Sequence, residues 1–230
     1  MNFNLIAGTA ATVALFIPVV LILAGRLFTN GSLFSLFIYY LFTGLYNLVE
    51  LGVIELSPLQ KHNASVLFNY LDAPLMFLVL LYFCNERWKR KLVLAAMVVF
   101  GLYEVIIGIC FGLDPQSSVY LLGPGVVLVL AFSIYFFAHY GRLCIEQNKG
   151  IGKTLMLVSI LFCYGCFLVL YYLDYLVHTP DMADVFLIYY ISIFISAMIM
   201  SVGLFWIIKR SRTMKELQLT RKELALFFDK

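Results

Sequence analysis

The sequence predicts an all-α integral membrane protein, a bundle of seven transmembrane helices with the N-terminus outside and the C-terminus in the cytoplasm. The first observation behind this prediction is composition. Of the 230 residues, 63% are hydrophobic and only 13% are charged, whereas soluble domains carry roughly 25% charged residues. The second observation is a set of seven apolar runs, each close to the about 20 helical residues that cross a bilayer. These observations exclude a soluble enzyme, a disordered regulator and a nucleic-acid-binding domain.

The apolar runs divide the chain into two regions. Residues 1–208 form the predicted transmembrane domain, and residues 209–230 form a cytoplasmic amphipathic helical tail. The first run has no basic leader and is too long for a signal peptide, so we expect it to remain as a span. We place the seven spans at 3–25, 33–55, 66–84, 92–113, 119–140, 154–177 and 183–208.

The basic residues predict the orientation. All but one of the 16 Lys and Arg residues lie at one membrane face or in the tail, and the exception is Lys61. Because cytoplasmic loops are enriched in Lys and Arg, this face is predicted to be cytoplasmic. We expect the protein in a bacterial inner membrane or a plasma membrane. The same charges would contact anionic lipid headgroups of the bilayer and require no nucleic-acid partner.

The tail at 209–230 combines an apolar stripe with many charges. Leu217, Leu224 and either Phe227 or Phe228 recur at helical spacing, and Lys, Arg and Glu residues occupy most other positions. One interpretation is an interfacial helix on the inner leaflet. The other is a docking helix for a cytoplasmic or membrane partner protein.

Acidic and amide residues inside the predicted spans form the candidate ligand or proton site. Ionisable groups in lipid are costly and usually mark function or pairing. No basic residue lies in the spans to pair with these acids, so they cannot all stay ionised. We expect one or more to be protonated, or a cation to bind among them; Glu50 and Asp174 could instead extend to the outer headgroups. The candidate site residues are Glu50, Asn47, Asn69, Asp72, Glu104 and Asp174.

The sequence predicts neither catalytic residues nor a metal site. Its histidines, His62, His139 and His178, all lie near span ends, which is unfavourable for a zinc site within the membrane. Cys163 and Cys166 form a CxxC motif inside a span, where we expect small packing residues rather than redox chemistry.

Short motifs in several spans resemble the microbial (type 1) rhodopsins. The string Phe-Asn-Tyr-Leu-Asp at 68–72 is similar to Phe-Arg-Tyr-Ile-Asp in the third helix of proteorhodopsin-like members, whose Asp is the Schiff-base counterion and proton acceptor. The run 98–101 followed by Glu104, the run 162–172 and the run 187–206 resemble their fourth, sixth and seventh helices. The resemblance implies a rhodopsin-like fold over most of the chain, with the third-helix aspartate as the one retained functional residue.

The chain departs from that family where retinal is held. The resemblance aligns the retinal-binding lysine with Ala197, the seventh-helix aspartate with Ile193, the third-helix arginine with Asn69 and the sixth-helix tryptophan with Tyr164. A Schiff base needs a lysine amine, so we expect no covalent retinal and no light-driven pumping. A retinoid or another isoprenoid would bind non-covalently.

These observations favour a rhodopsin-like sensor or binding protein for a lipophilic ligand, in an aromatic pocket between the third, fifth, sixth and seventh helices. The expected pocket walls are Phe77, Tyr135, Tyr164, Phe167, Tyr171 and Tyr189. The alternative is a small proton- or cation-coupled transporter that uses the intramembrane carboxylates as its coupling site. We rank an assembly subunit third and an intramembrane enzyme last, because no nucleophile, base and metal lie in register.

Overall fold

The computed structural model describes residues 3–112, 115–147, 149–176 and 182–228, and every regular element within these ranges is helical. Seven of the described helices are long and apolar enough to cross a membrane, which confirms the predicted seven-helix fold. Their bounds are α1 Phe3–Ala24, α2 Gly31–Glu50, α3 Pro58–Leu80, α4 Arg87–Phe111, α5 Pro115–Gln147, α6 Ile151–Tyr171 and α7 Met182–Phe228. The orientation with the N-terminus outside remains a prediction from the basic residues.

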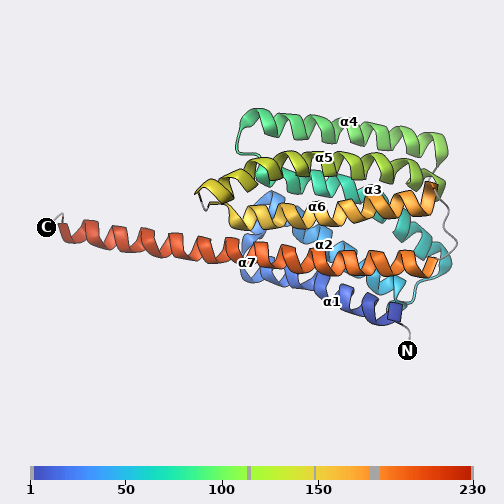
Figure 1. Ribbon diagram of the computed structural model, residues 1–230, viewed down its shortest axis with the longest axis horizontal. Helices are drawn as coiled ribbons and strands as arrows, with labels where there is room; N and C mark the ends of the chain where they lie inside the picture. Colours follow the sequence, from blue (N-terminus) through green and yellow to red (C-terminus); the bar gives the residue numbers. More distant parts are fainter. Residues whose placement is uncertain (1–2, 113–114, 148, 177–181, 229–230) are drawn as a thin grey trace.

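The helices form one bundle in which α6 packs between α5 and α7, and α7 packs against both α6 and α1 (Figure 1). α2 packs against α1 and α3, and α3 also contacts α5. α4 is the outermost helix in the view and packs against α5 and α3. All seven helices contribute to the buried hydrophobic core, and the polar site described below lies between α1, α2, α3, α6 and α7.

The connection between α2 and α3 differs from the prediction. α2 ends at Glu50, five residues before the predicted end, and Gly52 follows in a left-handed conformation with φ of 73°. α3 begins at Pro58, eight residues before the predicted start, because Ser57 and Gln60 form a capping box there. Hydropathy did not reveal this start, since the first turns of α3 are polar while the cap is a local hydrogen-bonding feature.

The earlier start of α3 places Asp72 deep in the bundle. Asp72 lies 14 residues after Pro58, or about 21 Å along the helix axis. The predicted start would have put it only about 9 Å from the helix end. Pro74 lies within α3, and the helix continues past it to Leu80. Asp72 is therefore several turns from either end of its helix, and its side chain is only 6% exposed.

The last helix does not stop at the membrane boundary. Residues 209–228 are helical as predicted, but they continue α7 without a break instead of forming a separate element. The sequence between Leu204 and Phe228 contains neither Gly nor Pro, so nothing in it interrupts the helix. In Figure 1 this extension projects far beyond the other six helices. Side chains from 215 onward lie outside the described residues, so the roles expected for the tail remain predictions.

Candidate functional site

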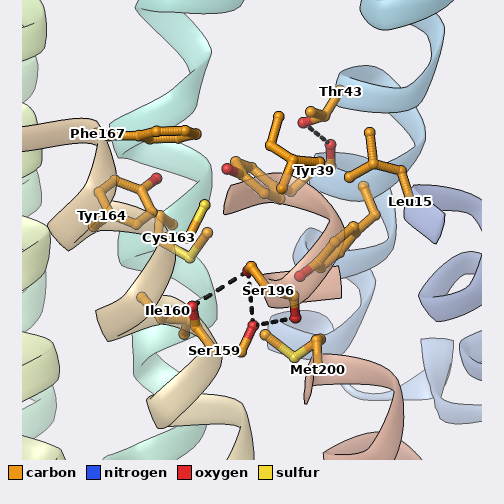
Figure 2. Close-up of a pocket in the computed structure, with 13 residues that line it drawn as sticks. Leu15, Tyr39, Thr43, Ser159, Ile160, Cys163, Tyr164, Phe167, Ser196 and Met200 are labelled. Atoms are coloured by element: carbon orange, nitrogen blue, oxygen red, sulfur yellow. Dashed lines mark hydrogen bonds between the residues drawn. The ribbon is translucent and has the colours of Figure 1, made fainter. Parts of the chain in front are cut away.

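A small cavity lies at the centre of the bundle, enclosed by α1, α2, α3, α6 and α7 (Figure 2). Its volume is about 20 Å³, which is room for roughly one water molecule. Hydroxyl groups and one thiol are interspersed among apolar side chains in its wall. The lining residues are Leu15, Tyr39, Tyr40, Thr43, Met76, Ser159, Ile160, Cys163, Tyr164, Phe167, Ile193, Ser196 and Met200.

Two serines join α6 to α7 at the edge of this cavity, as the dashed lines in Figure 2 show. The Ser159 hydroxyl donates to the backbone oxygen of Ser196 at 2.7 Å, and the two hydroxyl oxygens are 3.0 Å apart. The Ser196 hydroxyl lies 3.3 Å from the backbone oxygen of Ser159. Small hydroxyl residues let helices approach closely and form hydrogen bonds between them in lipid. The pair therefore fixes α6 against α7.

The buried carboxyl group of Asp72 connects α3 to α6. The Tyr164 hydroxyl donates a hydrogen bond to Asp72 Oδ2 over 2.9 Å, although 92 residues separate the two. Asp72 is 6% exposed and Tyr164 is fully buried. In the described part of the chain, the other carboxyl oxygen, Oδ1, has no hydrogen-bond partner. A neutral carboxyl suits this environment better than a carboxylate, since one donor does not compensate a buried charge.

The six candidate site residues do not form one cluster. Glu50 makes an ion pair with Lys61, with 3.0 Å between Oε2 and Nζ, which corrects the expectation that no basic residue pairs with the acids. The prediction missed this pair because it placed Lys61 in a loop, whereas the residue lies in the first turns of α3. Asn47 is fully buried and accepts a hydrogen bond from the Tyr189 hydroxyl at 3.3 Å, while its Nδ2 has no partner within the described residues.

The remaining candidates lie apart from these. Asn69 is partly buried on α3. Glu104 is 9% exposed on α4, and its Oε1 has no hydrogen-bond partner among the described residues. Asp174 falls in the π-helix Tyr172–Leu176, and its side chain lies outside the described residues. The expected four-carboxylate cluster is therefore not seen in the described part of the structure.

A second buried hydroxyl group lies at the α3–α4 interface, one turn from Glu104. The hydroxyl of Tyr70 reaches α4 at Gly108, one turn beyond Glu104, where an added Cβ would lie 3.2 Å from that oxygen. Like Glu104 Oε1, the Tyr70 hydroxyl is buried with no partner in the described ranges. The sequence analysis did not select Tyr70, because the depth of a residue in its span does not show toward which neighbouring helix its side chain points.

The six expected pocket walls likewise do not enclose one pocket. Tyr164 and Phe167 line the central cavity. The other four lie outside its lining. The Phe77 ring is fully buried, with its centroid 6.0 Å from that of Phe132, and the Tyr189 ring stacks on that of Phe167 with 5.9 Å between centroids. The Tyr171 hydroxyl donates to the backbone oxygen of Val119 at 3.2 Å, and Tyr135 is 43% exposed.

The cavity differs from the expected pocket in its helices. Its described lining takes no residue from α5, and α2 supplies Tyr39, Tyr40 and Thr43 instead. The Thr43 hydroxyl donates to the Tyr39 backbone oxygen at 2.8 Å, so its hydrogen bond is formed within its own helix (Figure 2). In the sequence, the hydroxyl residues at 39, 40 and 43 were the one indication that α2 lines the cavity. The prediction considered only acidic and amide residues and therefore missed it.

Three positions that the resemblance aligns with the retinal site are buried in the core of the bundle. Tyr164, aligned with the sixth-helix tryptophan, contacts Asp72, and Ile193 lines the cavity. Ala197, aligned with the retinal-binding lysine, is fully buried.

Comparison with known proteins gives no relative for this chain: no protein-family model, curated protein or solved structure matches it. The fold defines the class, an α-helical protein with seven helices able to span a membrane. The resemblance to microbial rhodopsins stays a prediction.

Proposed function

We propose that the chain is a seven-helix membrane sensor, in which a change at the buried Asp72–Tyr164 contact is transmitted through α6 and α7 to the helical extension of α7. One observation carries the proposal. A single helix, α6, bonds to the core carboxyl through Tyr164 and to α7 through Ser159. These two residues are five positions apart, so a movement of α6 that follows loss of the first contact acts directly on the second.

Close packing of α6 and α7 supports this coupling. A Cβ added at Gly152 would lie 2.8 Å from the backbone oxygen of Gly203, so the two backbones are in direct contact there. Because such packed interfaces rearrange between discrete positions rather than deform smoothly, a displaced α6 would displace α7 with it. α7 is unbroken from Met182 to Phe228 and would carry that displacement beyond the membrane.

The stimulus that we propose is a lipophilic ligand that reaches the core from the bilayer. Ligand pockets for drug-sized molecules measure about 300–1,000 Å³, whereas the central cavity holds about 20 Å³. Such a ligand would therefore have to separate α2, which carries Tyr39 and Tyr40, from α6. In this proposal, ligand binding and helix movement are the same event.

Distance measurements can test the coupling. We would place spin labels, through an unnatural amino acid, at the exposed positions Ile145 on α5 and Met214 on α7, which leaves the native cysteines intact. Tyr164→Phe removes the hydrogen bond to Asp72, and it should shift the distance distribution between the labels. Ser201→Ala should not shift it, because Ser201 bonds within α7 to the Ala197 backbone oxygen at 2.7 Å. Equal distributions for wild type and Tyr164→Phe would contradict the sensor proposal.

Extraction of purified protein tests the ligand class. Organic extraction followed by mass spectrometry should recover an isoprenoid or another lipophilic molecule near one per chain. The substitution Ser159→Leu places a larger side chain in the cavity wall and should reduce the amount of the lipophilic molecule recovered. If extraction recovers only bulk membrane lipid, the lipophilic stimulus is wrong, while the coupling between α6 and α7 is still decided by the spin labels.

A second candidate, a proton-coupled transporter, is favoured by one specific observation. Asp72 Oδ1 and Glu104 Oε1 are buried oxygens without hydrogen-bond partners among the described residues, on the neighbouring helices α3 and α4. Such groups can take up and release protons. In proteoliposomes, Asp72→Asn and Glu104→Gln should each abolish proton-coupled flux of a transported solute. Flux that is indifferent to both substitutions would remove this candidate.

A further inference from the structure

A second hollow lies at the end of the bundle where α7 extends beyond the other helices. It is a groove of about 650 Å³ between the turn that joins α5 to α6 and the α7 segment around residue 210. Among the described residues, four basic ones line it, Lys149, Lys153, Lys209 and Arg210, and none of the described lining residues is acidic. We refer to this feature, with Trp206 on its wall, as the basic groove.

Lys153 is held in place by uncharged partners. Its Nζ donates to the backbone oxygen of Tyr82 at 3.2 Å and to the Tyr140 hydroxyl at 3.1 Å. The same ammonium group lies 4.7 Å and 4.9 Å from the centroids of the Tyr82 and Tyr140 rings. These contacts orient the lysine without neutralising it. By contrast, Arg142, which does not line the groove, pairs with Glu146 at 2.6 Å.

The backbone adds to the positive potential of the groove. α6 begins at Ile151 in the groove wall, after Gly150 with φ of 80°. Within the described ranges no side chain caps this helix end, and its first turn contains no acidic residue. The first N–H groups of a helix are unsatisfied, and the helix dipole is positive there. The groove thus combines four cationic side chains with an uncompensated helix N-terminus.

The groove also has an apolar wall, which narrows the class of ligand. Trp206, Ile207, Leu143 and Met214 line it beside the cations. Trp206 is exposed near the end of the apolar part of α7, and Lys209 Nζ lies 5.6 Å from its ring centroid. Tryptophan is typical of the membrane–water interface. Cationic side chains next to an apolar wall at the membrane–water interface suit an amphiphile with an anionic headgroup. A free anion would contact only the cationic side chains and leave the apolar wall empty.

We propose that the basic groove binds an anionic phospholipid, with the phosphate at Lys149, Lys209, Arg210 and the start of α6, and the acyl chains along Trp206. Basic pockets between transmembrane helices are known sites for anionic headgroups. By the predicted orientation, this lipid belongs to the cytoplasmic leaflet. The lipid connects α7 to the α5–α6 turn and stabilises the position from which the α7 extension leaves the bundle. The proposal does not depend on the sensor function.

The test compares two triple variants of the full chain. Lys149→Gln/Lys209→Gln/Arg210→Gln removes three charges from the groove and leaves Lys153 to its structural contacts. The matched control, Arg87→Gln/Arg90→Gln/Lys91→Gln, removes three exposed charges from the start of α4, at the same end of the bundle. Binding of phosphatidylglycerol is measured by native mass spectrometry, and melting temperature is measured in nanodiscs of phosphatidylcholine with and without phosphatidylglycerol.

Phosphatidylglycerol should raise the melting temperature of the wild type and of the control variant, and the groove variant should lose most of that rise. The dissociation constant of the bound lipid should increase roughly 100-fold in the groove variant and roughly fivefold in Arg210→Gln alone. Equal losses in both triple variants, or no loss in the groove variant and in Arg210→Gln, would overturn the proposal. So would inorganic phosphate alone stabilising the protein as much as the lipid does, because that result identifies a free-anion site.

Discussion

The expected protonation of Asp72 is the residue-scale prediction with the most direct test. The Tyr164 hydroxyl donates to its carboxyl group, and the Asp72 side chain is buried in the bundle. We therefore expect a neutral carboxyl, which should give an infrared C=O band at neutral pH that disappears in Asp72→Asn. This substitution should be tolerated, because the amide oxygen can still accept from Tyr164. An ionised Asp72 down to pH 4 would contradict the prediction.

Tyr164→Phe probes the same contact from the other side. It leaves the buried carboxyl of Asp72 without its donor, and leaving a buried polar group unsatisfied costs about 1–3 kcal/mol. Thermal unfolding in detergent should therefore show a clear loss of stability for Tyr164→Phe and little change for Asp72→Asn. The same ranking should hold in nanodiscs. A Tyr164→Phe variant as stable as the wild type would show that the contact contributes nothing.

Glu86 provides a pH-dependent prediction outside the spans. Hydrogen bonds from Lys89 at 2.5 Å and from Trp88 lower the pKa of the Glu86 carboxyl below its ordinary value of 4.5. A group whose pKa is lower in the folded state stabilises the fold above its unfolded pKa, and this contribution is lost as the pH falls through the folded pKa. The melting-temperature difference between wild type and Glu86→Gln should therefore be constant near neutral pH and shrink below about pH 4.5. A difference that grows on acidification would contradict this assignment.

At the scale of elements, the contact between α6 and α7 depends on glycine. A Cβ at Gly152 would lie 2.8 Å from the Gly203 backbone oxygen, so Gly152→Ala must push the helices apart. We expect it to lower stability by about 1–3 kcal/mol, as overpacking does in other well-packed interiors. Gly165→Ala is the matched control on the same helix, because a Cβ there meets no atom within 4 Å. In thermal unfolding, Gly165→Ala should be neutral or slightly stabilising; a cost as large as that of Gly152→Ala would show that steric contact is not the cause.

Local sequence explains why the seven spans are helical, but it predicts only some of the residues at which the helices begin and end. Apolar runs predicted all seven spans, because a span is defined by about 20 residues of local composition. The start of α3 was missed by eight residues, since a capping box outweighed the polar character of its first turns. The unbroken continuation of α7 was also missed, because a change in polarity was taken as a change of element while the backbone had no reason to stop.

For the whole molecule, topology is the testable consequence of the charge distribution. All but one of the 16 basic residues lie on one predicted side, so cysteines introduced at the exposed positions among 87–90, which are 87, 88 and 90, should be protected from membrane-impermeant reagents in intact cells. Cysteines at 59–63 should be labelled from outside. The native cysteines are replaced first, and permeabilised cells provide the control for reactivity. Labelling of positions 87–90 from outside would reverse the predicted topology.

By itself, the sequence determined that this chain has seven apolar helices, which of their residues are acidic, and which end of the bundle carries the basic charge. These properties are local, since hydropathy and charge can be read residue by residue along a span. Tertiary structure alone decided that Asp72 contacts Tyr164, that Glu50 pairs with Lys61, and that α2 rather than α5 lines the central cavity. Those outcomes depend on how each helix is rotated and which neighbour it meets. In a chain that is apolar on nearly every face, hydrophobic periodicity leaves that rotation undetermined, and close packing at small residues such as Gly152 and Gly203 sets it instead.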